Sequence, residues 1–337
     1  MRLVQLRHSE KGRRIAVVDG DELHLIRDSC RSTYELAAGA IERDVGLRSI
    51  ASELASDARL DYESVYCERS PWVVLPAFDH PSEPARCLVT GTGLTHRLSA
   101  QARQKIHLDG EEDEAELTDS MRIYRWGVQG GRPERGAIGV QPEWFYKGCG
   151  SVLRAHNESL EVPRYGDDGG EEAEVAGAYL IAPDGSPRRV GLMQGNEFSD
   201  HVMESKNYLY LAPSKLRTCS VGPELVIGTE FRDVRGTVRI ERGAKIIWER
   251  PVATGEENMC HSLANLEHHH FKYPAHRRAG DAHIHFFGAN VVSFGEKLTL
   301  EHGDVMIVEL EGFGRSLRNP LAVDRGREHP IVVRPLA

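Results

Sequence analysis

Short runs of apolar residues, separated by Gly-rich and Pro-rich turns, dominate the hydrophobic pattern beyond about residue 85. Runs of this length, with alternating or continuous apolar positions, predict β-strands. They cover residues 86–94, 173–182, 188–198, 236–250, 281–294 and 304–314. Helical spacing is limited there to about 97–125 and 257–272. Many strands with few helices favour a β-rich α+β fold over a doubly wound parallel sheet.

The first 75 residues follow a different pattern, in which short strands precede helices. Strands are predicted at 2–6, 13–20 and 21–26, and helices at 32–42 and 49–55. Ser32 or Thr33 is the expected N-cap of the first helix. The stretch LPAFDHPSEPARC is Pro-rich and non-periodic, as linkers are. We therefore predict a small N-terminal α/β domain at 1–75, a linker at 76–85 and a larger domain at 86–330.

Composition and charge narrow the class of the protein. Of its 337 residues, 40% are apolar and 28% are charged, which is ordinary for a globular chain. The formal net charge of −9 argues against a nucleic-acid partner, which would require a basic face. The N-terminus has no apolar leader and no run approaches about 18 apolar residues, so we expect a cytoplasmic protein without a membrane partner. The six cysteines are dispersed without a CxxC pair, which predicts free thiols.

Residues 169–181, GGEEAEVAGAYLI, place carboxylates directly before a strand that reads as buried. Glu172 and Glu174 are two residues apart, so on an extended chain they point to the same side, about 6.5–7 Å apart. Two such carboxylates can converge on one hard divalent cation, which prefers oxygen ligands. Glu197, at the end of another apolar strand, is the candidate for a third ligand. Lys215 stands in an otherwise apolar segment, where it could bind a substrate carboxylate or act as a base.

Six motifs, taken in order, resemble the fumarylacetoacetate hydrolase superfamily over about residues 84–325. They are QPEWFYKG (141–148), GGEEAEVAGAYLI (169–181), GNEFSDH (195–201), YLAPSKLRTCSVGPEL (210–225), HFFGANVVSF (285–294) and GFGRSLRNP (312–320). The resemblance implies a mixed β-roll domain, homodimers, and Mg²⁺ (or Mn²⁺/Ca²⁺) held by three carboxylates. Carried over to this sequence, the three ligands are Glu172, Glu174 and Glu197. The third ligand is usually Asp in the family, so Glu197 adds one methylene.

The region around His96 separates the branches of the superfamily. Its hydrolases usually have a Glu three residues after a His. Here the residue three positions after His96 is Ser99. The dipeptide Ala102-Arg103, the block 142–147 and the segment 207–223 resemble instead the 2-keto-3-deoxy sugar-acid dehydratase branch, and the whole chain resembles the GguC-like group.

The implied reaction is dehydration of a 2-keto-3-deoxy sugar acid, with a pentonate such as 2-keto-3-deoxy-arabinonate expected, through a metal-stabilised enolate. C–C bond hydrolysis of a 2,4-diketo acid is the alternative. Other lyase chemistry, such as decarboxylation, and a non-catalytic sugar-acid binding protein also stay open.

The resemblance implies further site residues. Lys215 is expected to act as the base or to bind the substrate carboxylate. His96, or an acidic residue such as Glu112 or Glu116, is expected to protonate the leaving hydroxyl. The acidic segment around these glutamates, 110–119, is either a solvated helix face or a lid. Expected substrate-binding residues are Phe145, Lys147, Arg103, Ser199, Gly288 and Ala289.

Two histidine-rich stretches invite a metal-site interpretation. His268, His269 and His270 are consecutive on a predicted helix, where neighbours point about 100° apart and cannot converge on one ion. His283 and His285 share one face of a predicted strand, but no third ligand of the same kind follows them. We therefore expect the three consecutive histidines to be interface or surface groups. We expect His283 and His285 to serve packing or substrate contact.

Overall fold

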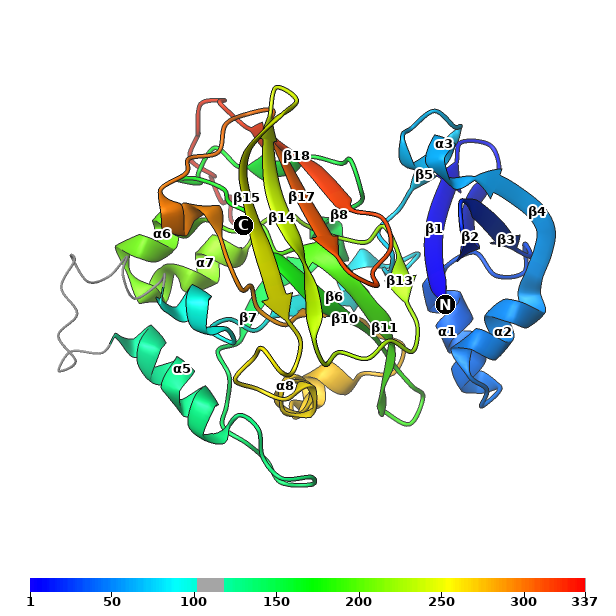
Figure 1. Ribbon diagram of the computed structural model, residues 1–337, viewed down its shortest axis with the longest axis horizontal. Helices are drawn as coiled ribbons and strands as arrows, with labels where there is room; N and C mark the ends of the chain where they lie inside the picture. The colour runs from blue at the N-terminus through cyan, green and yellow to red at the C-terminus, as the bar shows by residue number, and fades with distance from the viewer. Residues whose placement is uncertain (102–117, 337) are drawn as a thin grey trace.

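The structure is a computed structural model that describes residues 1–101 and 118–336. Two β-sheets form the body of the molecule, with the N-terminal elements on one side of it (Figure 1). Within these residues, the first sheet has 13 strands and the second has five. Most strand pairs are antiparallel and three are parallel. The predicted β-rich α+β fold with mixed sheets is confirmed.

The elements have the following bounds. The first sheet consists of β1 (Arg2–His8), β2 (Gly12–Asp19), β3 (Glu22–Ile26), β4 (Ala55–Asp61), β5 (Trp72–Val74), β6 (Cys87–Gly91), β7 (Phe145–Cys149), β8 (Leu153–Arg154), β10 (Ala173–Ile181), β11 (Pro187–Asn196), β12 (Cys219–Val221), β13 (Leu225–Val226) and β16 (Ala282–Phe286). The second sheet consists of β9 (Leu160–Val162), β14 (Val234–Arg242), β15 (Lys245–Thr254), β17 (Val305–Leu310) and β18 (Leu317–Val323). The helices are α1 (Thr33–Glu42), α2 (Leu47–Leu54), α3 (Tyr62–Tyr66), α5 (Asp119–Gly130), α6 (His201–Lys206), α7 (Leu211–Lys215) and α8 (Leu263–Phe271).

The N-terminal elements match the sequence pattern closely. All three predicted strands and both predicted helices are present, and Ser32 is the N-cap of α1, accepting a hydrogen bond from the backbone N–H of Glu35. Strands β1 to β4 form an antiparallel meander that continues the first sheet through the pairing of β1 with β13. Leu3 and Ile15 share one apolar cluster with Ala176 and Phe286, so the core extends across the predicted linker. The division into separate domains stays a prediction.

The register of the first sheet brings distant segments to one edge. Strand β10, in which every residue is buried, lies between β11 and β16. Strand β16 pairs in turn with β6, and β6 with β7. The start of β10, the end of β11, the end of β16, the end of β6 and the start of β7 therefore lie side by side. This edge carries the candidate site.

Several expectations about the larger domain are wrong. The short helices α6 and α7 lie outside the two predicted helical regions, because five or six residues carry too little periodicity to be recognised. The run 281–294 is a strand only as far as Phe286 and continues as an irregular segment.

None of the described helices combines the length and the apolarity that a membrane crossing requires.

Candidate active site

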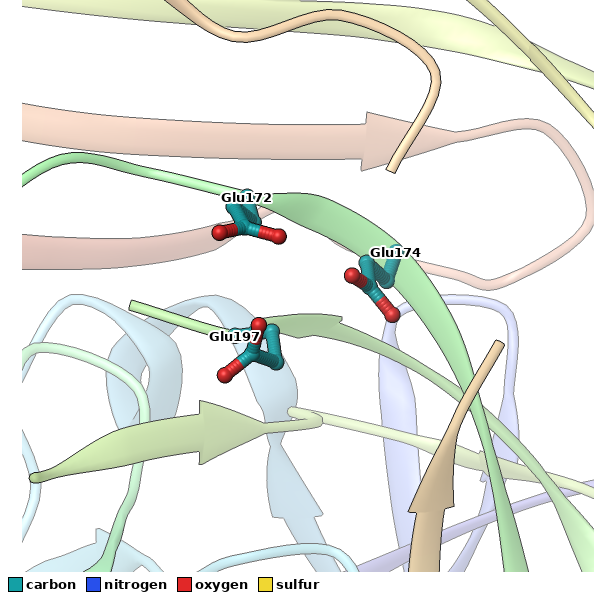
Figure 2. Close-up of side chains that lie close together, drawn as sticks. All are labelled: Glu172, Glu174 and Glu197. Atoms are coloured by element: carbon teal, nitrogen blue, oxygen red, sulfur yellow. The ribbon is translucent and has the colours of Figure 1, made fainter. Parts of the chain in front are cut away.

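Three buried glutamates meet at this edge of the sheet (Figure 2). Glu172 lies directly before β10, Glu174 lies within it, and Glu197 directly follows β11. One ligand atom from each lies within 4.8 Å of the other two. The register pairs Ala173 with Asn196, which places Glu197 beside the two other carboxylates. The structure thus brings together the three residues that were predicted as metal ligands.

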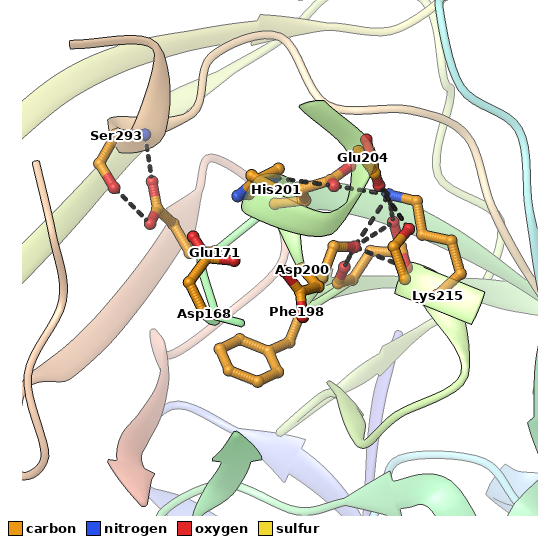
Figure 3. A network of polar contacts seen from close by, with 12 residues as sticks. Asp168, Glu171, Phe198, Asp200, His201, Glu204, Lys215 and Ser293 are labelled. Carbon is orange, nitrogen blue, oxygen red and sulfur yellow. Dashed lines mark hydrogen bonds and ion pairs between the residues drawn. The ribbon is translucent and has the colours of Figure 1, made fainter. Parts of the chain in front are cut away.

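Lys215 supplies a buried ammonium group to the same cluster (Figure 3). Its Nζ donates to Glu172 Oε1 at 2.6 Å, to Glu197 Oε2 at 2.8 Å and to Ser199 Oγ at 2.8 Å. It also lies 3.2 Å from Glu204 Oε1. Charge-assisted hydrogen bonds of this length are among the strongest in proteins. Lys215 therefore fixes the orientation of two of the three candidate ligands.

Strand β7 presents two side chains to the cluster. Phe145 and Lys147 are buried, and Tyr146 between them is exposed. The centre of the Phe145 ring lies 4.8 Å from Lys215 Nζ. Glu143, which was not among the predicted site residues, is buried directly upstream of this strand.

Lys147 forms a buried ion pair with Glu197. Its Nζ lies 2.5 Å from Glu197 Oε1 and donates to the carbonyl oxygens of Phe198 and Lys215, at 2.6 and 3.1 Å. All three partners are protein atoms, and the side chain is fully buried. The described contacts of Lys147 thus position a candidate ligand. A direct contact of Lys147 with substrate stays a prediction.

The charges in this cluster do not balance. Its carboxylates are those of Glu172, Glu174, Glu197 and Glu204, and its basic groups are the ammonium groups of Lys147 and Lys215 and the His201 ring. When all are ionised, four negative charges face three positive ones, and buried charge is costly unless it is compensated. Glu174 Oε1 is also buried without a hydrogen-bond partner among the described residues. A divalent cation fits this site, because hard cations such as Mg²⁺ take carboxylate oxygens.

Burial and neighbouring charges drive the pKa values of the three glutamates apart. Burial opposes the ionisation of Glu172, but the Lys215 ammonium and the His201 ring hold its pKa well below the usual range. Burial, reinforced by the charges of Glu197 and Glu172, raises the pKa of Glu174 well above the usual range. Burial also raises the pKa of Glu197, against the opposing effect of its two lysines. Glu174 is therefore the carboxylate that most needs an added positive charge to stay ionised.

Helix α6 contributes two side chains that the sequence analysis did not assign. His201 Nε2 lies 3.1 Å from Glu172 Oε1, and Glu204 Oε1 accepts a hydrogen bond from Ser214. Both are buried, whereas the two residues between them are half-buried. A spacing of three places them on one face of the helix. That spacing, directly after the third candidate ligand, was the available signal in the sequence.

Comparison with known proteins gives one curated relative and several solved structures. The chain is 26% identical over 313 residues to a probable 2-keto-3-deoxyxylonate dehydratase of Haloferax volcanii, which covers 89% of this chain and 95% of that protein. No family model matches the chain.

The solved structures share the fold. A 2-keto-3-deoxy-D-arabinonate dehydratase complexed with magnesium and 2,5-dioxopentanoate has a TM-score of 0.68 at 18% identity, with 97% of this chain and 100% of that chain covered. At this identity the likeness shows a common fold. A second solved structure, the 5-carboxymethyl-2-hydroxymuconate delta-isomerase from Mycobacterium smegmatis, has a TM-score of 0.57 at 14% identity, with 96% of this chain and 100% of that chain covered.

His96 lies in an environment that disfavours its expected role as an acid. Its Nδ1 lies 2.9 Å from Thr95 Oγ1 and its Nε2 lies 3.1 Å from Thr254 Oγ1. Burial lowers the pKa of His96 to about 3. The ring is therefore neutral near pH 7, where it cannot deliver a proton as an imidazolium. Ser99, where the superfamily's hydrolases have a glutamate, donates its hydroxyl to the carbonyl oxygen of His96.

Some of the remaining candidate residues lie at the glutamate cluster, and the others lie outside the described residues. Ser199 contacts Lys215 and Glu197 through its hydroxyl. Gly288 donates its backbone N–H to Glu174 Oε2 at 2.7 Å, and Ala289 is buried beside it. Gly288 has a φ of +99°, which a residue with a Cβ atom rarely adopts. The others, Arg103, Glu112 and Glu116, lie outside the described residues.

The histidines form a packed cluster. His270 Nε2 lies 3.0 Å from His283 Nδ1, and the ring of His270 stacks on His285 with centres 4.4 Å apart. His285 lies between the hydroxyls of Thr90 and Thr92. Among the described residues, the only group with metal-ligand geometry is the glutamate triad. These contacts agree with the packing expected of His283 and His285, whereas His269 and His270, expected at an interface or at the surface, are buried in this chain.

We expect the free energy of unfolding to fall as the pH is lowered below 6.5. Burial lowers the pKa values of His96, His283 and His285 from 6.5 to about 3. The unfolded chain takes up protons below pH 6.5 that the folded chain excludes, so each histidine costs roughly 2 kcal/mol by pH 5. This stability is fully present above pH 6.5 and is lost as the pH falls toward the folded pKa. Denaturant unfolding at pH 7 and pH 5 measures it, and His285→Gln should reduce the difference by roughly 2 kcal/mol, the contribution of one such histidine. Equal stability at both pH values would contradict the prediction.

Shortening Glu197 should weaken the cation site without destroying it. The longer side chain reaches Lys147 and Lys215 at the same time. In Glu197→Asp, we expect the loss of one charge-assisted hydrogen bond, and thus roughly 1.5–3 kcal/mol of stability. Mg²⁺ affinity should fall about tenfold, because the ligand loses its orientation. Thermal unfolding and titration calorimetry with Mg²⁺ measure the two effects. Unchanged stability and affinity would show that the extra methylene has no role.

Proposed function

We propose that the protein is a metal-dependent hydro-lyase that removes water from a 2-keto-3-deoxy sugar acid, with a pentonate as the preferred substrate. The observation that carries the proposal is the buried triad of Glu172, Glu174 and Glu197, with its excess of negative charge and the orphaned oxygen of Glu174. The names of the curated relative and of the dehydratase structure support this substrate class. A divalent cation bound at the triad supplies Lewis acidity toward the carbonyl oxygen of a 2-keto acid, which acidifies the adjacent C–H bond.

Lys215 and Lys147 organise the carboxylates before substrate arrives. Lys215 Nζ bridges Glu172 and Glu197, and Lys147 Nζ holds the other oxygen of Glu197. Because all of these groups are buried, their positions are set by the fold and do not have to reorganise during the reaction. We assign Lys215 to the orientation of the ligands and to the binding of the substrate carboxylate.

Proton transfer requires a group beside the C3–H bond and the leaving hydroxyl. His96 is disfavoured for this role because its ring is neutral and both nitrogens contact threonine hydroxyls. We propose Glu143, a buried carboxylate two residues before Phe145. A Cβ atom placed on Gly93 would lie 2.6 Å from Glu143 Oε2, so the Glu143 carboxylate packs against the loop that follows β6. It therefore lies at the same edge of the sheet as the triad.

C–C bond hydrolysis is the weaker alternative. It requires a general base that activates water, and the superfamily's hydrolases use a carboxylate near their histidine. In this protein, the described partners of the His96 ring are hydroxyl groups, those of Thr95 and Thr254. No contact in the described residues favours hydrolysis over dehydration.

We propose that Mg²⁺ is the cation and that the protein is a cytoplasmic homodimer. The all-carboxylate donor set suits Mg²⁺, and the solved dehydratase binds magnesium. Exposed apolar side chains next to the helix that carries Lys215 support a partner surface; they are Leu209, Tyr210 and Leu216. All six cysteines are free, as in a reducing compartment.

The proposal is tested by comparing substrates. We would measure kcat/KM with Mg²⁺ on a 2-keto-3-deoxypentonate, a 2-keto-3-deoxyhexonate and a 2,4-diketo acid. The proposal predicts dehydration of both sugar acids, with the pentonate faster. Cleavage of the diketo acid into two fragments at a higher kcat/KM would make the protein a hydrolase. An absence of turnover with every compound would favour a binding protein.

A further inference from the structure

The segment from Gly288 to Ser293, here called the arch, is tied at both ends to the chain that carries the candidate ligands. At one end, the Gly288 N–H donates to Glu174 Oε2 at 2.7 Å. At the other end, Ser293 donates its backbone N–H to Glu171 Oε1 and its hydroxyl to Glu171 Oε2, both at 2.7 Å (Figure 3). The two anchoring carboxylates lie on either side of Glu172 in the sequence. The arch is therefore fixed to the segment whose carboxylates form the triad.

The burial of the Glu171 carboxylate is energetically unfavourable. Its side chain is fully buried, and none of the ion pairs among the described residues includes it. A buried carboxylate without a cation costs free energy that its hydrogen bonds must offset. Both of its oxygens are bonded to a single residue, Ser293, in a two-point contact that fixes distance and direction together. Such a contact is useful where the position of the bonded segment matters.

The residue after the anchor connects the arch to a second ligand. The Phe294 ring stacks on His201, with ring centres 5.2 Å apart and an interplanar angle of 26°. His201 Nε2 in turn lies 3.1 Å from Glu172 Oε1. The arch thus reaches Glu174 through Gly288, and it reaches Glu172 through Phe294 and His201.

We propose that Glu171 and Ser293 form a latch that positions the metal-binding carboxylates Glu172 and Glu174 by holding the arch. Neither residue contacts the cation; both act through the arch, and are positioning residues. The inference rests on the proposed function for the statement that the triad binds Mg²⁺. Groups that orient metal ligands typically affect metal affinity by about 10–100-fold. We expect a decrease of the same size in Mg²⁺ affinity when the contact between Glu171 and Ser293 is removed.

The chain offers matched variants. Glu171→Ala removes both bonds and Ser293→Ala removes one, so both open the latch. Glu171→Gln and Ser293→Thr keep an acceptor or a hydroxyl at the same place, and should restore function. Ser32→Ala removes a comparable buried serine hydrogen bond, at the N-cap of α1 in the N-terminal region. It tests whether a general loss of stability has the same consequence.

The experiment is calorimetric titration of each purified full-length variant with Mg²⁺, together with thermal unfolding. We expect Glu171→Ala and Ser293→Ala to weaken Mg²⁺ binding about tenfold or more. Glu171→Gln, Ser293→Thr and Ser32→Ala should stay within about threefold of the wild type. If Glu171→Ala does not fold, Ser293→Ala decides.

Three outcomes separate the latch from its alternatives. Latch variants that unfold more easily but bind Mg²⁺ as tightly as the wild type would overturn the proposal, because the contact would then be only structural. A wild-type protein that binds no Mg²⁺ would overturn it as well. A wild-type protein that binds Mg²⁺ but dehydrates no sugar acid would contradict the proposed function alone, and the Mg²⁺ affinities of the variants would still judge the latch.

Discussion

Replacing Lys215 with methionine is expected to reduce turnover by about 10–100-fold, the range typical for loss of a group that orients metal ligands. The ammonium bridges Glu172 and Glu197 and contacts Glu204, all of them buried. Methionine has a similar length but no charge, so these carboxylates would lose one of the two ammonium groups beside them. Removal of one partner from a buried charge cluster typically costs roughly 3–5 kcal/mol of stability. Steady-state kinetics and denaturant unfolding measure the two effects.

Lys206→Met is the matched control for this prediction. Lys206 lies in α6, near the same cluster, but its ammonium pairs with Asp167 at the surface and its side chain is 52% exposed. Surface ion pairs contribute little, so stability should hardly change, and turnover should be unaffected. If both lysine variants lost activity equally, the buried position of Lys215 would not explain the effect.

Glu174→Gln should abolish Mg²⁺ binding while leaving the metal-free protein as stable as the wild type or more so. Burial and the charges of Glu197 and Glu172 raise the pKa of Glu174. Without a cation, ionisation of Glu174 therefore lowers the stability of the folded chain. The amide has the same shape and no charge, and it therefore relieves that repulsion. It also removes one anionic ligand of the triad, so Mg²⁺ affinity should fall by at least about 100-fold. Titration calorimetry and thermal unfolding in EDTA measure the two effects.

Glu267→Gln provides the comparison. Burial also raises the pKa of Glu267, but this carboxylate lies on α8 and is bonded to Tyr179 and Arg189, away from the triad. The Glu267→Gln variant should therefore have the Mg²⁺ affinity of the wild type. If Glu174→Gln kept the wild-type affinity, the triad would not be the cation site.

Local patterns were enough to predict the parts of the fold that rest on periodicity. The alternating runs gave β1, β2, β3, β10 and β17, and the helical spacing with a serine N-cap gave α1. The spacing of Glu172 and Glu174 predicted their common direction, because residues i and i+2 of an extended chain share a face. Glu197 and Lys215 were candidates from their own segments, and the family resemblance supported placing them beside this pair.

The other parts of the site depend on contacts between segments that lie far apart in the sequence. His201 and Glu204 lie in a six-residue helix, where their spacing of three was the single local signal and was too short to predict a helix. Glu171 belonged to the quoted acidic stretch, but its partner Ser293 is 122 positions away and lay in a run that was predicted as a continuous strand. His96 was assigned from its motif, whereas its neutral state follows from burial beside Thr95 and Thr254. Neither partner choice nor burial can be read from spacing.

The most direct test of the account is the mass of the product formed from a 2-keto-3-deoxypentonate. Protein stripped with EDTA would be incubated with the substrate before and after the addition of Mg²⁺. The account predicts no product without the cation and, with it, a 2-keto acid lighter than the substrate by one water molecule. Water loss that proceeds equally well in EDTA, or an unchanged substrate with Mg²⁺ bound to the protein, would contradict it.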